Sequence, residues 1–300
     1  MRRIINLLLR LSVVSLFLLA GCGIDSHLQH AVKVEDPFSA EDDQSFTGMV
    51  LYYFSLPNGE STLVRFPSGK TLLIDTGAAE DGKTLLALLA ERRVTKLDYV
   101  LLSNDQPEQA GGYPYLASSL QIDTILMPKL IEPSIRRVVP VKSDKKLVLL
   151  SEGDVLQLEN KIALHVLHPS EYLFLSPQDN SLVFQLKQEN MRFLFTSAIG
   201  EKAEERLIQK HGKELRAEVL KVAAQGSNQA SSQPFLSLVD PQVAIVQTGI
   251  PRTEMKAGQD EIIERLGESW AETYITSQDG TIMILSNGKD YRVIKQKVRR

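Results

Sequence analysis

Cysteine is almost absent from this chain of 300 residues, which contains only Cys22. A single cysteine excludes an intrachain disulfide and a metal cluster held by several thiolates. Neither sign of charge dominates, because 34 basic residues face 37 acidic residues and the net charge is −3. This balance gives no electrostatic reason to expect nucleic acid as a partner, and we predict no clear nucleic-acid patch. Histidine is also scarce, with five residues, and none has a motif that makes it the base for a nucleophilic serine.

The first 22 residues have the pattern of a targeting segment. Arg2 and Arg3 supply positive charge, the apolar run 11–19 is too short to span a bilayer comfortably, and small residues precede Cys22. This order resembles the lipobox of bacterial lipoproteins, which implies cleavage before Cys22 and attachment of lipid to its thiol. We therefore expect a signal peptide over 1–21 and a lipid anchor that holds the protein on the extracytoplasmic face of a bacterial cell membrane.

Residues 22–47 are polar and acidic and show little periodicity, which predicts a flexible linker between the lipid and a folded domain. His27 and His30 lie in this linker, and two solvated side chains are a simpler interpretation than a metal pair. The folded domain is expected to cover residues 48–300, with no compositional break that would require a second domain.

The domain alternates β-rich runs, turn residues and segments with helical periodicity. We predict strands over residues 49–55, 61–66, 70–74, 99–102, 122–127, 147–150, 154–158, 162–167, 181–187, 191–196, 219–222, 243–246, 272–275, 281–285 and 290–294. We predict helices over residues 81–93, 113–119, 201–211, 234–239 and 260–266. Strands followed by helices, twice over, favour an α/β (α+β) fold built as a four-layer αββα sandwich of two mixed sheets flanked by helices.

The stretch 97–112 is where we expect the site of this domain. A buried strand over 99–102 stops at a polar loop, which turns at Gly111 and Gly112 into the next helix. In α/β proteins, the loop at the carboxyl end of a strand usually carries the chemistry. Here the loop contains amides and carboxylates but no histidine.

An ordered series of short motifs resembles the metallo-β-lactamase-like hydrolases, and more narrowly the extracellular domain of ComEC-type competence proteins. The motifs that carry this resemblance are residues 72–77 (LLIDTG), 97–103 with Gly111 and Gly112, 179–183 (DNSLV), 193–196 (FLFT), 219–222 (VLKV) before Gly226 and Ser227, and 277–282 (SQDGTI). The resemblance covers residues 48–290 approximately. It implies the αββα fold and a centre of two divalent metal ions, usually zinc.

The resemblance also locates the positions that would hold those ions, and these positions carry poor ligands. The family motif H-x-H-x-D-H falls on Asn104, Gln106, Glu108 and Gln109. The bridging aspartate of the family falls on Ala198, and a histidine pair falls on Ala224 and Gln225. Amides and methyl groups do not hold a borderline-soft ion such as zinc, so we expect no metal and no cofactor.

The resulting prediction is a pseudoenzyme that acts by binding or scaffolding, with a small ligand or a protein partner in a vestigial pocket. The lining predicted for that pocket is Asp75, Asn104, Gln106, Glu108, Gln109, Ala198, Ala224 and Gln225. For Asp75, whose family role is to orient the metal-binding loop, we expect hydrogen bonds to loop amides.

Two alternatives remain open. Asp75 and Glu108 could hold a hard ion such as Mg²⁺ or Mn²⁺ in a hydrolase that acts on phosphodiesters or nucleic acid. The second alternative is an accessory role in DNA uptake. The remaining histidines do not favour a metal, because His165 and His168 should point to opposite faces of a strand and His211 lies at a helix end.

Overall fold

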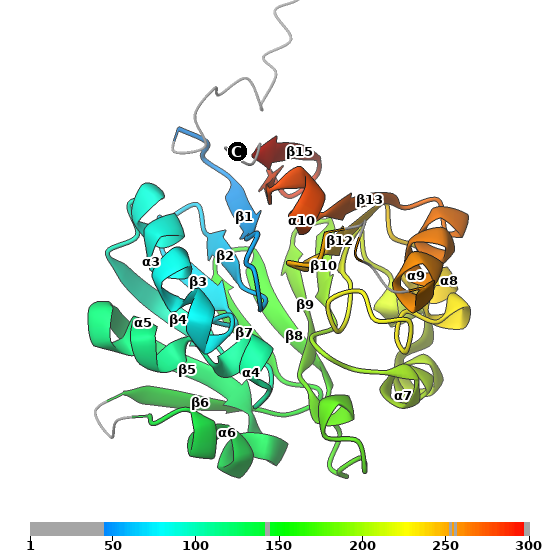
Figure 1. The fold of residues 1–300 in the computed structure, drawn as a ribbon, viewed down its shortest axis with the longest axis horizontal. Coiled ribbons are helices and arrows are strands. Elements are labelled where there is room, and N and C mark those ends of the chain that lie inside the picture. The colour runs from blue at the N-terminus through cyan, green and yellow to red at the C-terminus, as the bar shows by residue number, and fades with distance from the viewer. Residues whose placement is uncertain (1–44, 142–144, 252–253, 255–256, 297–300) are drawn as a thin grey trace, which may run out of the picture. The chain divides into compact units, whose positions relative to one another are not determined.

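Two mixed β-sheets pack face to face at the centre of the fold in a computed structural model that describes residues 45–141, 145–251, 254 and 257–296 (Figure 1). These residues belong to one compact unit over 42–300. The signal peptide, Cys22 and most of the linker predicted from the sequence lie outside the described residues. No helix in the described part of the chain is both long enough and apolar enough to cross a bilayer.

The first sheet has eight strands in the order β15-β14-β1-β2-β3-β4-β5-β6. Their bounds are β1 Met49–Tyr53, β2 Thr62–Arg65, β3 Thr71–Ile74, β4 Lys96–Leu101, β5 Gln121–Pro128, β6 Lys146–Leu150, β14 Thr281–Ser286 and β15 Tyr291–Gln296. Strands β3 to β6 run parallel, whereas β15, β14, β1, β2 and β3 pair in antiparallel fashion.

The second sheet has seven strands in the order β13-β12-β11-β10-β9-β8-β7. Their bounds are β7 Val155–Glu159, β8 Ile162–His168, β9 Val183–Gln188, β10 Met191–Phe195, β11 Val219–Lys221, β12 Val243–Val246 and β13 Glu272–Ile275. Strands β10 to β13 are parallel, and β7 to β10 are antiparallel. Each sheet therefore combines a parallel half with hairpins, as expected.

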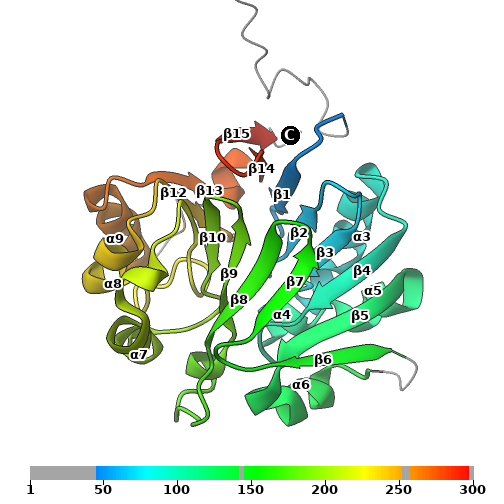
Figure 2. The same ribbon diagram turned by 180° about the vertical axis from the view of Figure 1, so that it is seen from behind.

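Helices cover the outer faces of both sheets (Figures 1 and 2). The first sheet carries α3 Gly82–Glu91, α5 Tyr113–Ser119 and α6 Glu132–Val138, and the second carries α7 Glu201–His211, α8 Gln233–Val239 and α9 Ala257–Glu268. Short elements complete the chain: α4 Pro107–Ala110, α10 Thr276–Asp279 and the 3-10 helices η1 Ala79–Asp81, η2 Lys129–Ile131, η3 Pro177–Asn180 and η4 Gly212–Leu215. The predicted four-layer αββα sandwich is confirmed.

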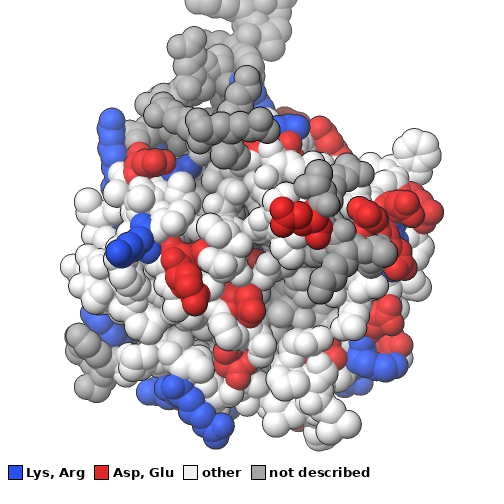
Figure 3. Space-filling view, in the orientation of Figure 1, with Lys and Arg blue, Asp and Glu red and all other residues white. Residues whose placement is uncertain are grey.

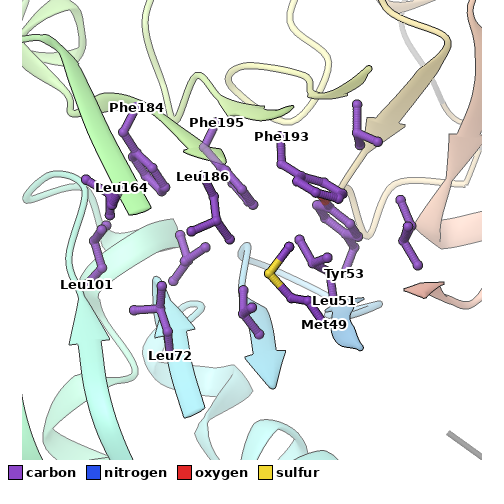
Figure 4. Close-up of a cluster of buried hydrophobic side chains, with 14 of the residues drawn as sticks. Met49, Leu51, Tyr53, Leu72, Leu101, Leu164, Phe184, Leu186, Phe193 and Phe195 are labelled. Atoms are coloured by element: carbon purple, nitrogen blue, oxygen red, sulfur yellow. The ribbon is translucent and has the colours of Figure 1, made fainter. Parts of the chain in front are cut away.

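The main apolar core lies between the two sheets (Figure 4). Leu51 and Leu72 of the first sheet and Leu186 of the second are among its fully buried members. The rings of Phe184 and Phe195 stack with their centroids 5.0 Å apart. Burial of apolar side chains on alternate strand positions fixes which face of each sheet points inward, because side chains alternate along a strand.

The structure adds short helices that the sequence analysis did not predict. Helix α6 is one of them, and Pro133 stands in its first turn, where no intrahelical N–H is needed. Helix α4 likewise begins at Pro107, and α10 lies between the predicted strands 272–275 and 281–285. Helix α9 begins at Ala257 rather than at Asp260.

Candidate functional site

The carboxyl ends of parallel strands from both sheets meet at one edge of the sandwich. Ser103 and Asn104 follow β4, and Ser197 follows β10. The hydroxyl oxygens of Ser103 and Ser197 are 2.5 Å apart, and Asn104 Nδ2 donates to Ser197 Oγ at 3.0 Å. The strand-end loops therefore join the two sheets directly at the position predicted for the site.

Asp75 is buried at the end of β3 and holds the loop that follows β4. Its two carboxylate oxygens accept from the backbone N–H and the hydroxyl of Ser103, both at 2.8 Å. The expected hydrogen bond to a loop amide is thus present. Burial raises the pKa of Asp75 to about 7, although the bonds from Ser103 and the charge of Lys221 act in the opposite direction.

Asn104 is fully buried, and its side chain is engaged by the protein itself. Its Nδ2 also donates to Ser181 Oγ at 3.1 Å, and its Oδ1 accepts from the backbone N–H of Gln106 at 2.8 Å. The side chain of Gln106 donates to Asp105 at 3.2 Å. The amide at the first family ligand position therefore serves as an internal connector of loops.

Two charged residues that the sequence analysis did not identify lie in the centre of this region. Lys221, the last residue of β11, places its Nζ 2.5 Å from Glu60 Oε1, and their side chains are 5% and 1% exposed. Burying one charge alone is very unfavourable, so the two are stabilised as a pair. The only sequence signal was a lysine within an otherwise apolar strand.

Glu60 also binds two of the three glutamines predicted to line the pocket. Gln109 Nε2 donates to Glu60 Oε2 at 2.7 Å, and the backbone N–H of Gln225 donates to Oε1 at 3.2 Å. The carboxylate of Glu60 therefore connects the chain before β2, helix α4 and the loop after β11. These contacts leave little room, because the cavity lined by Glu60, Asp75 and Lys221 measures about 10 Å³, roughly the space of one water molecule.

The other predicted residues lie in the same loops. Ala198 is buried and follows β10 in the chain. Ala224 and Gln225 follow β11, and Gln225 is half-buried. Glu108 in α4 contributes its carbonyl oxygen, which accepts from the N–H of Glu60 at 2.9 Å. The structure thus brings the predicted positions to one edge, around a nearly filled centre.

Left-handed backbone conformations gather in these loops. Asp75, Ser197, Ala224 and Gln225 have φ angles of 58°, 46°, 48° and 56°. Such conformations are uncommon for residues with a side chain and cluster at functional sites. The packing around these loops must therefore stabilise backbone conformations that are costly on their own.

The segment Gly77–Thr84 matches the pattern G-x-x-x-x-G-K-T and follows a strand, as phosphate-binding loops do. Here the loop contains its own anion. Asp81 is buried, and its carboxylate accepts from the backbone N–H of Ala78 at 3.1 Å and from the side chain of Asn58 at 3.0 Å. A phosphate would meet that carboxylate, and Lys83 is exposed to solvent, so this loop is not a phosphate site.

Two histidines of the domain, His168 and His211, have structural partners. His168 is buried, its Nε2 is 2.7 Å from the carbonyl oxygen of Asp179, and burial lowers its pKa. His165 is only half-buried, as expected for the opposite face of β8. His211 ends α7, and its Nε2 is 2.9 Å from the carbonyl oxygen of Leu167.

The donor set at the strand ends does not fit a pair of zinc ions. The predicted ligand positions carry amides, methyl groups and the single carboxylate of Glu108. The two buried carboxylates nearby are engaged, Asp75 by Ser103 and Glu60 by the ammonium group of Lys221. No group of three or more His, Cys, Asp or Glu residues that could hold a metal ion is found among the described residues. Zinc requires several imidazole, thiolate or carboxylate ligands.

Known proteins share this fold. The metallo-β-lactamase fold protein YhfI from Bacillus subtilis superimposes with a TM-score of 0.51 and 14% identity, over 76% of this chain and 96% of that one. CmlA, a diiron β-hydroxylase from Streptomyces venezuelae, superimposes with a TM-score of 0.52 and 10% identity, over 83% of this chain and 54% of that one. The chain therefore has the metallo-β-lactamase fold.

Sequence comparison narrows the relationship. ComE operon protein 3 of Bacillus subtilis is 24% identical over 204 residues, which are 67% of this chain. Competence protein ComA of Neisseria gonorrhoeae is 27% identical over 197 residues, which are 64% of this chain. The chain is thus related to ComEC-type competence proteins, although it spans only about a quarter of the length of each, 26% in both cases. No family model matches it.

Proposed function

We propose that this chain is a pseudoenzyme of the metallo-β-lactamase fold, which has lost its metal ligands and acts by binding or scaffolding. The observation that carries the proposal is the buried ion pair of Lys221 and Glu60 at the strand ends where the fold family holds metal. A lysine ammonium supplies a fixed positive charge, but it cannot activate water as a Lewis acid. Asn104 and Gln109 also form hydrogen bonds within the protein, so the polar groups of the site hold the loops together rather than serving turnover.

We further propose that the mature chain is attached to the extracytoplasmic face of a bacterial membrane through lipid on Cys22. The support is the sequence pattern that ends at Cys22, in which small residues follow a short apolar run. Several acyl chains on one residue give stable membrane attachment. A protein held in this way can present a binding domain at the surface without a membrane-spanning helix.

Metal content and turnover test the pseudoenzyme proposal together. The full-length chain is dialysed against zinc and manganese, desalted and analysed by plasma mass spectrometry, and hydrolysis of bis(p-nitrophenyl) phosphate is followed in parallel. We expect less than about a tenth of an ion per chain, because weak amide ligands release metal on desalting. One or two retained ions with hydrolysis that Glu108→Ala abolishes would establish the metal-dependent hydrolase alternative.

The relationship to two competence proteins favours a second candidate, an accessory role in DNA uptake. Charge does not add to it: on the face in Figure 3, acidic and basic side chains are interspersed. Electrophoretic mobility shifts with double-stranded DNA at low and high salt test this role. Binding that weakens steeply with salt supports it, and no shift at low salt rejects it, because phosphate contacts dominate DNA affinity.

A further inference from the structure

A second and much larger cavity opens beside the closed site. It measures about 570 Å³ and is lined by residues that follow β5, β6 and β8 and by helix α7. Strands β5 and β6 run parallel to β4, so their ends lie at the same edge of the first sheet as the site. The cavity is within the range of small-molecule sites, which usually occupy 300 to 1,000 Å³, on the order of a drug-sized ligand.

Three cations from two layers of the fold line this cavity. Lys129 comes from η2, and Arg206 and Lys210 come from α7. Arg206 and Lys210 are four residues apart, so they lie on the same face of the helix, where two like charges repel. The charge of Lys210 is compensated by Glu152, because Lys210 Nζ lies 2.6 Å from Glu152 Oε2.

The remaining charges do not neutralise the cavity. Both carboxylate oxygens of Glu152 are occupied, one by Lys210 and the other by His211 Nε2 at 3.0 Å. Arg206 and Lys129 form no side-chain hydrogen bond or ion pair with any described residue. Glu171 is the other acid in the lining, so three cations face two carboxylates.

Apolar groups complete the lining and narrow the class of ligand. Leu130, Leu150 and Pro169 contribute carbon surface, and the ring of Tyr172 at the cavity is 76% exposed. Ser151 and Ser170 add hydroxyls. We propose that this cavity binds a small organic anion in which a phosphate or carboxylate is joined to an apolar or aromatic group, with Arg206 and Lys129 on the anion.

This assignment rests on the proposed binding function and names its ligand class. A guanidinium suits it because it donates two parallel hydrogen bonds to a phosphate or carboxylate, whereas an ammonium acts as a point charge. The aromatic or apolar part of the ligand would take the place of water on the leucine, proline and tyrosine surfaces. Phosphate and carboxylate share this chemistry, and the experiment separates them.

Calorimetric titration of the full-length chain with phenyl phosphate and with benzoate tests the site, and phenol serves as the uncharged probe. We expect one ligand per chain and binding by phenol that is weaker by about tenfold or more, because it lacks the charge-assisted hydrogen bonds. Arg206→Ala and Lys129→Ala should each weaken binding about fivefold or more. Stronger binding of phenyl phosphate or of benzoate identifies the natural head group.

Lys202→Ala is the matched control, because it removes one positive charge from the same helix outside the cavity lining. Its affinity should stay within about twofold of the wild type, since surface charges beyond the first contacts are screened. Absence of binding at about 10 mM ligand, or equal weakening by Lys202→Ala and Arg206→Ala, overturns the site. Release of phenol from bound phenyl phosphate overturns the pseudoenzyme proposal while leaving this site intact.

Discussion

Lys221 places a positive charge inside the fold, and that buried charge is stabilised by Glu60. Removing one partner of a buried ion pair strands the other, which typically costs about 3–5 kcal/mol, whereas replacing both with neutral groups can be nearly neutral. The pair in this chain has additional neighbours, because Glu60 also accepts from Gln109 and Gln225. Loss of the charge should therefore loosen three loops together.

We expect Lys221→Met to lower the free energy of unfolding by about 3 kcal/mol, because it leaves Glu60 charged and buried. The double variant Lys221→Met with Glu60→Gln should recover at least about 1 kcal/mol of that loss, since the second substitution replaces the stranded carboxylate with a neutral amide that can still bond with Gln109. Urea unfolding measures both. Lys202→Met, at an exposed position of α7, should change stability by less than about 0.5 kcal/mol; equal effects at positions 202 and 221 would contradict the role of Lys221.

Asp75 should make stability depend on pH. Its pKa is about 7 in the folded protein and 3.8 in the unfolded chain, so between these values the folded state binds the extra proton. The stabilisation that Asp75 contributes is then fully present below about pH 4 and is lost as pH rises towards 7, by up to about 1.4 kcal/mol per pH unit. Asp75→Asn keeps a neutral group at this position and should flatten that slope in urea unfolding measured from pH 4 to 8.

Burial also raises the pKa of Glu204, which contributes in the same direction in both proteins. The comparison between wild type and Asp75→Asn isolates Asp75 for this reason. Equal slopes in the two proteins would show that Asp75 stays ionised when buried.

At the level of residues, the sequence showed that the family's metal ligands are absent from the site, but it did not show which residues occupy the centre of the site instead. The motif order predicted that Asn104, Gln109 and Asp75 lie near one another, and the structure places Asp75 after β3, Asn104 after β4 and Gln109 in α4. Glu60 and Lys221 were not identified, since they are 161 positions apart and only the packing of the two sheets brings them together. A lysine within the apolar strand Val219–Lys221 was the available signal, because a buried cation requires a partner.

Among the elements, the strand-end loops approach each other so closely that glycine is required. A Cβ on Gly112 would lie 2.1 Å from the carbonyl oxygen of Thr76, which belongs to the loop after β3. No side chain fits at that distance without separation of the two loops. The helix α5 is thus anchored directly against the site.

Gly112→Ala should destabilise the fold by about 2 kcal/mol or more, because overpacking forces the backbone apart. Gly267→Ala is the control in α9, where a Cβ would meet no atom within 4 Å. That change should be neutral or stabilise by up to about 1 kcal/mol, since alanine favours helix. Thermal unfolding of both variants measures the difference, and a neutral Gly112→Ala would show that the loops can separate freely.

Strands were predicted more successfully than short helices. The hairpins β9–β10 and β14–β15 were both predicted, because alternating or apolar runs flank polar turns at 188–190 and 287–288. Helices α4 and α6 have four and seven residues, too few for a clear helical period, and each has a proline in its first turn. Their existence depends on packing at the sheet edge, which a local pattern cannot report.

On the scale of the whole molecule, the proposed lipid attachment would determine where any binding takes place. Cys22→Ser removes the only thiol and should shift the mature protein from the membrane fraction to the soluble fraction, because a serine hydroxyl is not lipidated. Fractionation and immunoblotting of the natural bacterial host measure this, and Ser26→Ala in the adjacent segment is the control. Retention in the membrane fraction of a Cys22→Ser protein that has lost residues 1–21 would exclude the lipid as the principal anchor.

The pairing of β1 with both β2 and β14 has a consequence for synthesis. Met49 lies opposite Ser286, which is made 237 positions later. A chain emerging from a ribosome or an export channel can form the β1–β2 hairpin early, but one edge of β1 stays unpaired until the last strands arrive. Contacts between such distant segments form slowly, and an exposed strand edge invites aggregation. Folding of this domain should therefore finish only after nearly the whole chain has been released. Until then, the incompletely folded chain is the species that needs protection by chaperones.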